Sequence, residues 1–496
     1  MYGITRAPAI DRPGLTWFNV DHPLGLDALR GKVVILDFWT SCCINCLHVI
    51  PTLRQIEEAF PDDVAVIGVH SPKFPAERDC TALRHAIARH DIRHPVVHDP
   101  DMLLWDEYCV KAWPTLVLLS PHGHVIGQVS GEPDPDRLLL GIGEMVRSFR
   151  SRGELTPGPL PLSLINAGSG ALRFPGKIKA LPRNPDGPWR AARWAVADAG
   201  HHQIMLLTDD GDPVARIGTG GGGFADGPPD AAAFLSPQGV AATADAIYVA
   251  DTGNHALRRI DRAHGRVSTI GGTGDRGLSL RGSRDGRDTA LASPWDVEAV
   301  GDLLVFANAG THQLGTYDPD CGTVALLAGT GGEALVDGPV ERAVLAQPSG
   351  LCLDAVAGLL YFVDSETSSV RRLTLNGQPR VETIVGAGLF DFGDDDGPLA
   401  EARLQHPLGL ACFGRGLVVA DTYNGRLRFI DLVGRSVHTI AEPRFSCRPG
   451  GCCTQHLAEP AGVTVAGPNR LMVSDTNHHR ILEYSLDTGR ARSWFE

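Results

Sequence analysis

The most restrictive feature of this sequence is a unit that recurs six times in its second part. Each copy opens with a proline, and neighbouring prolines are 53–62 residues apart: Pro175, Pro237, Pro294, Pro348, Pro407 and Pro460. A β-rich run follows each proline and ends in a small polar turn, such as Asp251-Thr-Gly-Asn-His255. Two further short strands follow the turn. Six units of four short strands, with almost no helical period, are typical of a β-propeller.

Glycine divides the chain into two parts of different build. Residues 1–150 contain 10 glycines and residues 151–496 contain 48, so the second part is rich in tight turns. Residues 151–171 are rich in proline, glycine and serine without a period, which is typical of a linker. The sequence therefore predicts a multidomain chain: an α/β domain over 1–150, a linker over 151–171 and an all-β six-bladed propeller over 172–496.

Residues 1–150 alternate between buried strands and amphipathic helices. Four apolar, β-branched runs predict strands: 33–39, 64–69, 115–119 and 125–129. Three segments have the apolar spacing of a helix: the one after Cys46, 76–90 and 136–150. A chain of this length and order is sufficient for one α/β core.

We expect the chemistry of this domain where the first strand meets the first helix. Cys43 and Cys46 form a Cys-x-x-Cys pair at that helix N-terminus. Free N–H groups and the positive end of the helix dipole favour a Cys43 thiolate there. A thiolate is the attacking species in disulfide exchange, and the second cysteine resolves the mixed disulfide. Half of a zinc site would have the same spacing, but Cys80 and Cys109 stand alone and supply no second pair.

The surroundings of this pair resemble thioredoxins over about residues 20–150. Asp37-Phe-Trp39 precedes the pair, Pro51 lies inside the following helix, and Trp113-Pro-Thr115 opens a later strand. The resemblance implies a role for each of four residues: Cys43 as nucleophile, Cys46 as resolving thiol, Asp37 as a buried carboxylate that relays a proton, and Pro114 as a cis-proline facing the disulfide.

The pair also departs from the thioredoxin pattern in two places. Cys42 occupies the position where thioredoxins commonly have tryptophan, and Ile44-Asn45 replaces Gly-Pro between the two cysteines. A redox potential therefore does not transfer from the resemblance. Cys42 is predicted to be a bystander, with alternative disulfides through this third thiol as the other reading.

The repeats resemble NHL repeats, as the segments YVADTGNHALRRID, LVVADTYNGRLRFID and LMVSDTNHHRILEY illustrate. Most copies also carry an insertion before the next opening proline, for example VDGPVERAVLAQP. A thioredoxin-like domain containing FWTSCCINC, followed by six NHL repeats, resembles the NHL-repeat-containing protein 2 family. This resemblance implies the same two-part architecture for the whole chain.

Three functions fit these features. The leading hypothesis is a thiol–disulfide oxidoreductase-like redox protein that acts on protein or peptide thiols and disulfides, with the propeller as a substrate- or partner-binding platform. A non-catalytic interaction scaffold is the first alternative, because a fold does not fix a function. The second is a thiol peroxidase, which Thr40-x-x-Cys43 supports, although Leu36 stands where that pattern has proline.

Recurrent polar residues of the repeats are predicted to be structural. Asp251 and its counterparts are expected to accept hydrogen bonds from turn N–H groups. Four histidines recur at one turn position: His202, His255, His312 and His479. Separate blades would hold them too far apart to share one metal ion. The fifth insertion contains Cys447, Cys452 and Cys453, for which an idle loop is predicted ahead of metal binding or a disulfide.

Charge and hydropathy bear on partners and compartment. The net charge of −13 disfavours nucleic acid as a partner. The sequence has no apolar run long enough for a bilayer and no apolar core of a signal peptide in its first thirty residues. Eleven cysteines in that setting favour a reducing cytoplasm. We expect no cofactor, no bound metal, and a protein partner on the propeller rim where the turns and insertions meet.

Overall fold

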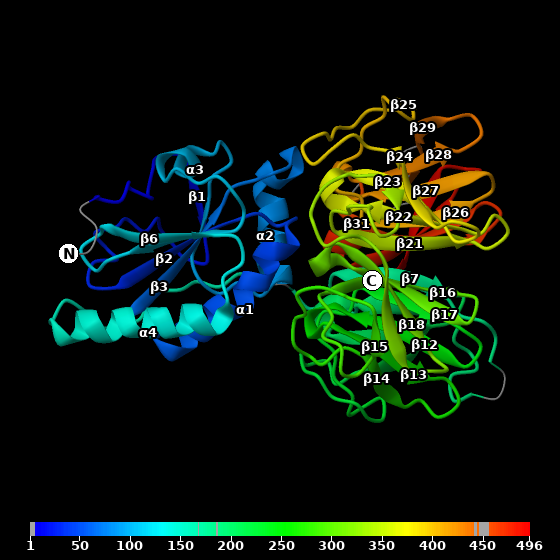
Figure 1. Ribbon diagram of the computed structural model, residues 1–496, viewed down its shortest axis with the longest axis horizontal. Helices are drawn as coiled ribbons and strands as arrows, with labels where there is room; N and C mark the ends of the chain where they lie inside the picture. The colour runs from blue at the N-terminus through cyan, green and yellow to red at the C-terminus, as the bar shows by residue number, and fades with distance from the viewer. Residues whose placement is uncertain (1–4, 167, 185–186, 441–443, 446–455) are drawn as a thin grey trace. The chain divides into compact units, whose positions relative to one another are not determined.

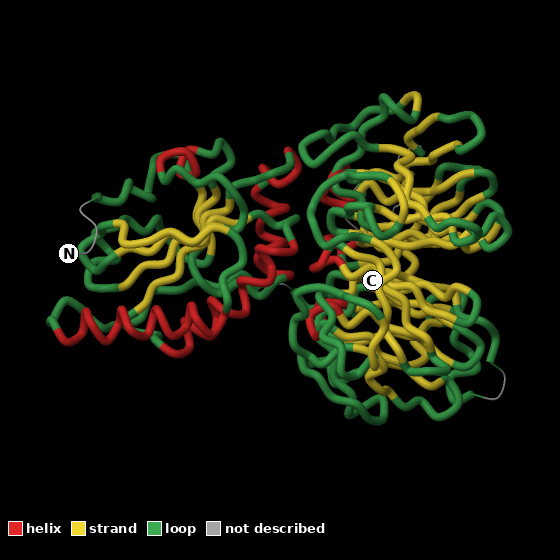
Figure 2. Tube along the Cα trace, in the orientation of Figure 1, coloured by secondary structure: helices red, strands yellow, loops and turns green. Residues whose placement is uncertain are grey.

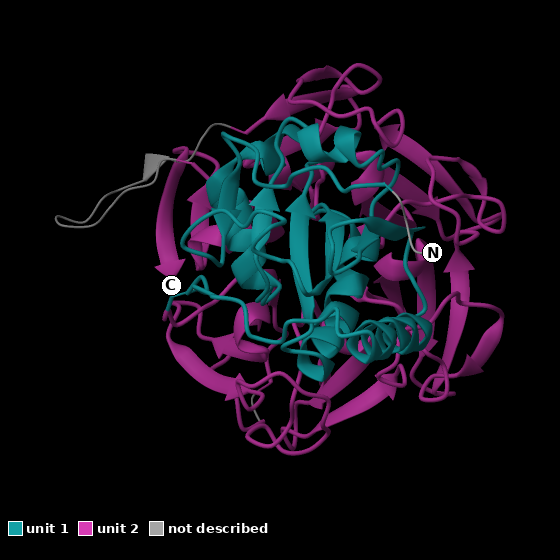
Figure 3. Cartoon of the chain, turned by 90° about the vertical axis from the view of Figure 1, so that its left-hand side faces the viewer, with its two compact units in different colours: residues 1–168 teal, residues 169–496 magenta. Residues whose placement is uncertain are grey.

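The computed structural model describes residues 5–166, 168–184, 187–440, 444–445 and 456–496. The chain forms two compact units, Met1–Gly168 and Ser169–Glu496, which Figure 3 distinguishes by colour. Every α-helix of the described residues belongs to unit 1, whereas unit 2 consists of strands joined by loops and short 3-10 turns (Figure 2).

Unit 1 is built on one mixed sheet with the strand order β1-β4-β3-β2-β5-β6 (Figure 1). Its strands are β1 (Thr16–Phe18), β2 (Val33–Trp39), β3 (Val64–His70), β4 (Val96–His98), β5 (Thr115–Leu119) and β6 (Val125–Ser130). Strand β2 pairs in parallel with β3 and antiparallel with β5, so it lies in the middle of the sheet. All seven residues of β2 are buried, because both faces of the sheet are covered.

The helices of unit 1 are α1 (Ile44–Ala59), η1 (Pro75–Arg78), α2 (Cys80–Arg89), α3 (Leu103–Glu107) and α4 (Pro135–Ser151). Leu53 of α1 and Ile142 of α4 pack with Val33 and Ile35 of β2 on one face of the sheet. Leu36 and Phe38 pack on the other face with Trp105 of α3. The alternation of side chains along β2 thus supplies both cores.

Several elements of unit 1 differ from the expectations. The strands β1 and β4 and the helix α3 are too short to give a periodic signal, and the sequence did not indicate them. The helix expected over 76–90 begins only at Cys80, because the Asp79 side chain accepts hydrogen bonds from the N–H groups of Thr81 and Ala82 and caps it there. Residues Pro75–Arg78 form a separate 3-10 turn.

The segment 151–171 is predicted as a linker, and its first part is hydrogen-bonded to other residues of unit 1. The N–H of Thr156 donates to Gly31 O at 2.9 Å, and that of Gly158 donates to Asp62 O at 3.1 Å. Ser163 and Ile165 bond to Asn19, through its backbone oxygen and its side chain respectively. The boundary between the two compact units lies after Gly168.

Unit 2 is a six-bladed propeller, and each repeat supplies one blade. We number the blades 1–6 in chain order. Within each blade the strands are given from the innermost outward. Blade 1 contains β7 (Pro175–Ala180), β8 (Trp194–Asp198), β9 (Gln203–Leu207) and β10 (Pro213–Ile217); blade 2 contains β11 (Gly239–Ala242), β12 (Ala246–Asp251), β13 (Ala256–Asp261) and β14 (Val267–Gly271); blade 3 contains β16 (Pro294–Val300), β17 (Leu303–Asn308), β18 (Gln313–Asp318) and β19 (Thr323–Ala328). Blade 4 contains β21 (Pro348–Asp354), β22 (Leu359–Asp364), β23 (Ser369–Thr374) and β24 (Arg380–Val385); blade 5 contains β26 (Gly409–Phe413), β27 (Gly416–Asp421), β28 (Arg426–Asp431) and β29 (Ser436–Thr439); blade 6 contains β31 (Pro460–Gly467), β32 (Arg470–Asp475), β33 (Arg480–Ser485) and β34 (Arg490–Phe495).

The first strand of every repeat is the innermost, and neighbouring inner strands are in contact all the way around the ring. The ring closes by packing between blades 6 and 1, and the four main strands of each of these blades come from a single repeat. Across this junction the Thr464 hydroxyl donates to Ile178 O, and the Thr476 hydroxyl donates to Pro175 O. Trp494 and Ile178 lie in one shared apolar cluster there.

Blades 3–6 contain a fifth short strand that was not predicted. These strands are β15 (Ser283–Asp285), β20 (Gly338–Pro339), β25 (Gly397–Pro398) and β30 (Arg444–Phe445). Each comes from the insertion that precedes its blade and pairs with the outermost strand. A sheet edge offers unpaired N–H and C=O groups, and the insertion satisfies part of them.

Candidate functional site

The two cysteines of the motif differ in exposure. Cys43 is the N-cap residue of α1 and is partly exposed, whereas Cys46, one turn later, is 0% exposed. The Cys46 N–H donates to Cys43 O at 3.0 Å, and both thiols are free. Burial, followed by a hydrogen bond with the Cys43 thiol, raises the pKa of Cys46 well above its ordinary value. The pair thus combines one accessible sulfur with one shielded sulfur.

Asp37 is a buried carboxyl group near the shielded cysteine. It lies within β2, is 2% exposed, and its Oδ1 has no hydrogen-bond partner among the described residues. Burial raises the pKa of Asp37 to about 7, and the charge of His94 acts in the opposite direction. Asp37 is also one of the groups that raise the pKa of Cys46. A pKa near neutral pH makes Asp37 a candidate proton acceptor for this thiol.

Glu77 fixes the loop that leads to Cys43, and the sequence did not single it out. Its side chain is 2% exposed and accepts hydrogen bonds from the Thr40 hydroxyl (2.6 Å), the Ser41 hydroxyl (2.8 Å) and the Cys42 N–H (3.0 Å). It also accepts from the Phe74 N–H at 2.9 Å. Burial raises the pKa of Glu77, and these hydrogen bonds oppose that effect.

A sequence signal for Glu77 existed. A proline at the first position of a helical turn with glutamate two residues later is typical of a capped N-terminus, and Pro75 and Glu77 have this spacing. The predicted helix over 76–90 places Glu77 inside a helix, whereas the structure places it at the start of a separate turn, Pro75–Arg78.

The segment that leads into β5 contains the predicted cis-proline. The Trp113–Pro114 bond is cis, as the resemblance to thioredoxins implied. Trp113 packs against the same apolar cluster as Cys43 and Cys46, and its indole N–H donates to Ser71 O at 2.9 Å. The structure thus joins this loop and the cysteine pair through one cluster.

Two residues shortly before Cys43, Thr40 and Cys42, are engaged elsewhere. The Thr40 hydroxyl donates to Glu77, so it is not directed at Cys43 as a peroxide-activating group would be. Cys42 is 2% exposed, and its sulfur lies 3.6 Å from Thr40 Oγ1. Cys42 is therefore much less accessible to a protein disulfide than Cys43.

The recurrent Asp and Asn residues of the propeller have a structural role, but their partners differ from the expected ones. At each of six positions, Oδ1 accepts a hydrogen bond of 2.7–3.0 Å from a backbone N–H that lies 16–25 residues earlier, in the segment entering the blade. These residues are Asp198, Asp251, Asn308, Asp364, Asp421 and Asp475. They therefore anchor the entering segment to the strand 2–3 turn, and do not only stabilise the turn itself.

The recurrent histidines have a structural role, as predicted, and the structure shows that this role is to connect consecutive blades. Their Nδ1 atoms accept a hydrogen bond of 3.0–3.1 Å from a backbone N–H that opens the following repeat. The four residues, His202, His255, His312 and His479, have left-handed φ values of 51–56° at the ends of the short turns η2 (Ala199–His201), η3 (Thr252–Asn254), η4 (Ala309–Thr311) and η7 (Thr476–His478). His479 bonds to Phe174 N and so helps to close the ring.

A buried arginine links the turn and the insertion in three blades, and the sequence did not reveal it. Arg258 is 0% exposed and donates to Asp251 Oδ2 at 2.7 Å and to Asp226 of the insertion at 2.9 Å. Arg371 and Arg428 make the equivalent pairs in blades 4 and 5. The strand 2–3 turns and the Asp-Gly insertions therefore lie on the same face of the propeller, as expected.

Two further features of the described residues concern metal ions and membranes. No cluster of three or more His, Cys, Asp or Glu residues that could hold a metal ion occurs among the described residues. Cys447, Cys452 and Cys453 lie outside those residues, so their predicted role stays a prediction. In the part of the chain that the structure describes, no helix has the length and apolar character needed to span a bilayer.

Comparison with known proteins identifies both units. A family profile described as "Thioredoxin-like" matches residues 31–125, and the "NHL repeat" profile matches residues 234–260. The chain is 36% identical over 512 residues to NHL repeat-containing protein 2 of Bos taurus, which covers 96% of this chain and 69% of the relative. It is 38% identical over 494 residues to the protein SUPPRESSOR OF QUENCHING 1, chloroplastic, of Arabidopsis thaliana.

The matches differ in how much of each relative they cover. This chain spans 46% of the length of the Arabidopsis relative, so about half of that protein has no counterpart here. A shorter match involves the thiol-disulfide oxidoreductase YkuV of Bacillus subtilis (strain 168), with 27% identity over 77 residues, which are 16% of this chain and 52% of the relative.

Proposed function

Because the chain belongs to the NHL repeat-containing protein 2 family, in which a thioredoxin-like domain precedes an NHL propeller, we propose that unit 1 is a thiol–disulfide oxidoreductase. The observation that carries this proposal is the contrast between partly exposed Cys43 at the N-cap of α1 and fully buried Cys46 beside buried Asp37. This is the arrangement that two successive thiol–disulfide exchanges require.

The exchange would proceed in two balanced steps. The Cys43 thiolate attacks one sulfur of a substrate disulfide, forms a mixed disulfide and expels the other substrate sulfur as a thiolate, which takes a proton from water. Cys46 then transfers its proton to the Asp37 carboxylate and attacks the Cys43 sulfur. The Cys43–Cys46 disulfide forms, the second substrate thiol leaves, and an external thiol reductant restores the pair.

Asp37 matters because Cys46 does not ionise readily by itself. Burial raises the pKa of this thiol well above its ordinary value, so a nearby base is needed to accept its proton. A carboxyl group whose pKa is about 7 is ionised in a large fraction of molecules at neutral pH. Pro114, in the loop that packs on the same cluster, would border the substrate.

We propose that the propeller binds the protein or peptide whose thiols or disulfide react. The strand 2–3 turns and the insertions meet on one face, where the buried Arg258 pairs with Asp251 of the turn and Asp226 of the insertion. Loops held rigidly by a scaffold are suited to partner binding. The net charge of −13 disfavours nucleic acid on this surface. We propose a reducing cytoplasm as the compartment of this protein, on the basis of its cysteine content.

The first test is a reductase assay with the full chain. A peptide with a single disulfide is the substrate, and dithiothreitol supplies the electrons. We expect catalysis above the dithiothreitol background and a loss of at least about 100-fold in the Cys43→Ser variant, which lacks the nucleophile. Cys42→Ser is the matched control, since Cys42 is adjacent but buried, and its rate should stay within about threefold of the parent rate.

Two outcomes would contradict the proposal. A parent protein no faster than dithiothreitol alone would indicate the non-catalytic scaffold. Consumption of hydrogen peroxide that depends on Cys43, without reduction of the peptide, would indicate the thiol peroxidase.

A further inference from the structure

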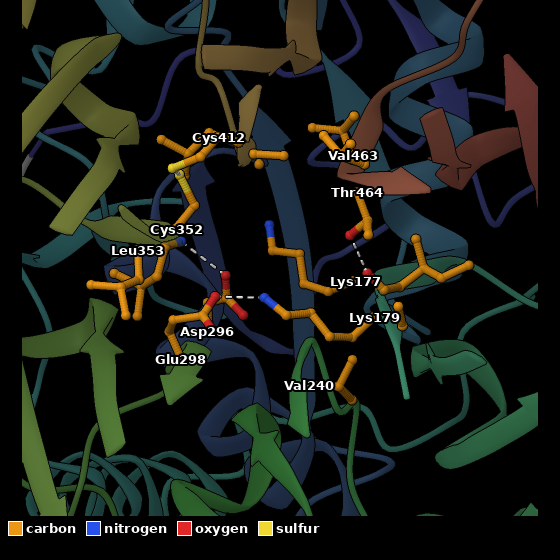
Figure 4. Close-up of a pocket in the computed structure, with 17 residues that line it drawn as sticks. Lys177, Lys179, Val240, Asp296, Glu298, Cys352, Leu353, Cys412, Val463 and Thr464 are labelled. Carbon is orange, nitrogen blue, oxygen red and sulfur yellow. Dashed lines mark hydrogen bonds and ion pairs between the residues drawn. The ribbon is translucent and has the colours of Figure 1, made fainter. Parts of the chain in front are cut away.

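A second pair of cysteines lies in the central channel of the propeller. Cys352 on β21 and Cys412 on β26 line a cavity of about 380 Å³ that is bordered by the inner strands (Figure 4). Their sulfur atoms are 2.6 Å apart, so the two side chains are in direct contact. The two residues are 60 positions apart and belong to blades 4 and 5.

The backbone of two neighbouring blades brings these sulfurs together. The inner strands approach closely at Gly350 and Gly409, where a Cβ on Gly350 would lie 2.7 Å from Leu408 O. Each cysteine follows its glycine by two or three residues on the same strand. The contact is therefore set by the ring of inner strands and not by mobile loops, which favours a specific bond between these two thiols.

The two thiols differ in accessibility and in surroundings. Cys352 is 6% exposed, whereas Cys412 is partly exposed. Burial, followed by the hydrogen bond to Cys412, raises the pKa of Cys352 well above its ordinary value, and the Lys179 ammonium acts in the opposite direction. Lys179 is held in the channel by an ion pair with Glu298 at 2.5 Å (Figure 4). Cys412 is thus placed to react first and Cys352 to react second.

We propose that Cys352 and Cys412 form a second thiol–disulfide site, at which a small-molecule disulfide oxidises both thiols to a bond that joins blades 4 and 5. The Cys412 thiolate attacks one sulfur of the small disulfide and expels the other half as a thiol. Cys352 then attacks the Cys412 sulfur and releases the second thiol. Two protein thiols are oxidised, and one small disulfide is reduced to two thiols that carry the protons.

This site is independent of the cysteine pair in unit 1. Its oxidised form closes a covalent loop across two blades, which reduces the freedom of the unfolded chain and stabilises the propeller. Its reduced form leaves blades 4 and 5 joined by non-covalent contacts alone, such as the hydrogen bond from the Ser365 hydroxyl to Pro407 O. The propeller would thereby respond to the thiol–disulfide balance around it, whatever the activity of unit 1.

The test uses the full chain with Cys43→Ser and Cys46→Ser, so that unit 1 neither oxidises nor reduces the channel cysteines. The native protein is incubated with an excess of oxidised glutathione, quenched with acid, alkylated and digested with trypsin. Cleavage at arginine gives the peptides 343–371 and 404–415, each with a single cysteine. We expect these peptides to be joined by a disulfide, lighter than the two reduced peptides by two hydrogens, and separated by dithiothreitol.

Exposed Cys321 is the internal control, because its tryptic peptide 288–342 also has a single cysteine. It should carry a glutathione adduct under the same conditions. Glutathione adducts on Cys352 or Cys412 without the linked peptide would overturn the proposal, as would a linked peptide that forms only after denaturation.

A second readout is thermal stability. Oxidation should raise the Tm of the propeller by on the order of 5 °C, and Cys412→Ser should abolish this rise. Because Cys412 is partly exposed, serine is expected to be tolerated there. A rise that persists in Cys412→Ser would show that a different disulfide is responsible and would contradict the proposal.

Discussion

Replacing Asp37 by asparagine is expected to stabilise unit 1 at pH 8 and, at the same time, to slow disulfide exchange. The carboxyl group has a pKa of about 7 in the folded protein and an ordinary value of 3.8. Between these values the folded protein holds a proton that the unfolded chain releases, so stability falls as pH rises from about 4 to 7. The full effect corresponds to about 4 kcal/mol above pH 7, and asparagine removes it.

The same substitution removes the proton acceptor for Cys46. We expect the exchange rate to fall by about 100-fold at pH 7, and the rise in rate with pH centred near 7 to disappear. Native-state hydrogen exchange of the β2 and β3 amides at pH 5 and pH 8 measures the stability of unit 1. Single-turnover exchange over the same pH range measures the rate.

Asp63→Asn is the matched control for Asp37→Asn. Asp63 is also buried, at 4% exposure, but it is paired with Arg150. Its substitution should lower the stability of unit 1 and leave the pH dependence of exchange unchanged. If Asp37→Asn destabilised unit 1 at pH 8, or if both variants kept the same pH profile, the assignment of Asp37 as a buried, unpaired base would be wrong.

Replacing Arg258 by methionine is expected to lower the free energy of unfolding of the propeller by about 3–5 kcal/mol, because it leaves a buried carboxylate without its cation. Asp251 and Arg258 are both 0% exposed and are 2.7 Å apart. Burial raises the pKa of Asp251 to about 6, and Arg258 is the largest opposing influence. Arg258 also donates to the backbone oxygens of Ala225 and Ala233, which hold the insertion.

The double variant Asp251→Asn/Arg258→Met is the informative control. Blade 3 is a natural precedent for a neutral pair, because Asn308 and Gly315 occupy the corresponding positions. The double variant contains no unpaired charge, so we expect it to recover part of the stability lost in Arg258→Met. Urea denaturation of the full chain measures the free energy of unfolding of both variants. Equal losses in the two variants would show that the buried charge is not the cause.

The sequence predicted the architecture well because the same pattern of strands recurs in six repeats. Six prolines at nearly equal spacing, with a β-rich run after each, are sufficient to indicate six blades and their innermost strands. The strand–Cys-x-x-Cys–helix order likewise located Cys43 and Cys46 at the N-terminus of α1. These features are local patterns, and local patterns can be read from one sequence.

Contacts between distant segments could not be predicted in the same way. The Glu77 side chain bonds to Thr40, which is 37 residues earlier, and Arg258 reaches Asp226 across an insertion. Cys352 and Cys412 show no spacing that suggests a pair, and they meet only because two inner strands are neighbours in the ring. Such contacts depend on strand register and blade order, which the sequence pattern does not specify.

The most direct test of the central claim, that Cys43 is the nucleophile and Cys46 the resolving thiol, is to trap the mixed disulfide. The Cys46→Ser variant of the full chain is mixed with a disulfide-containing peptide, quenched with acid and analysed by mass spectrometry with fragmentation of the peptide 33–54. We predict a stable adduct on Cys43, since no resolving thiol remains, and no adduct in Cys43→Ser. An adduct on Cys42, or none on Cys43 while Cys43→Ser still forms one through Cys46, would contradict the account.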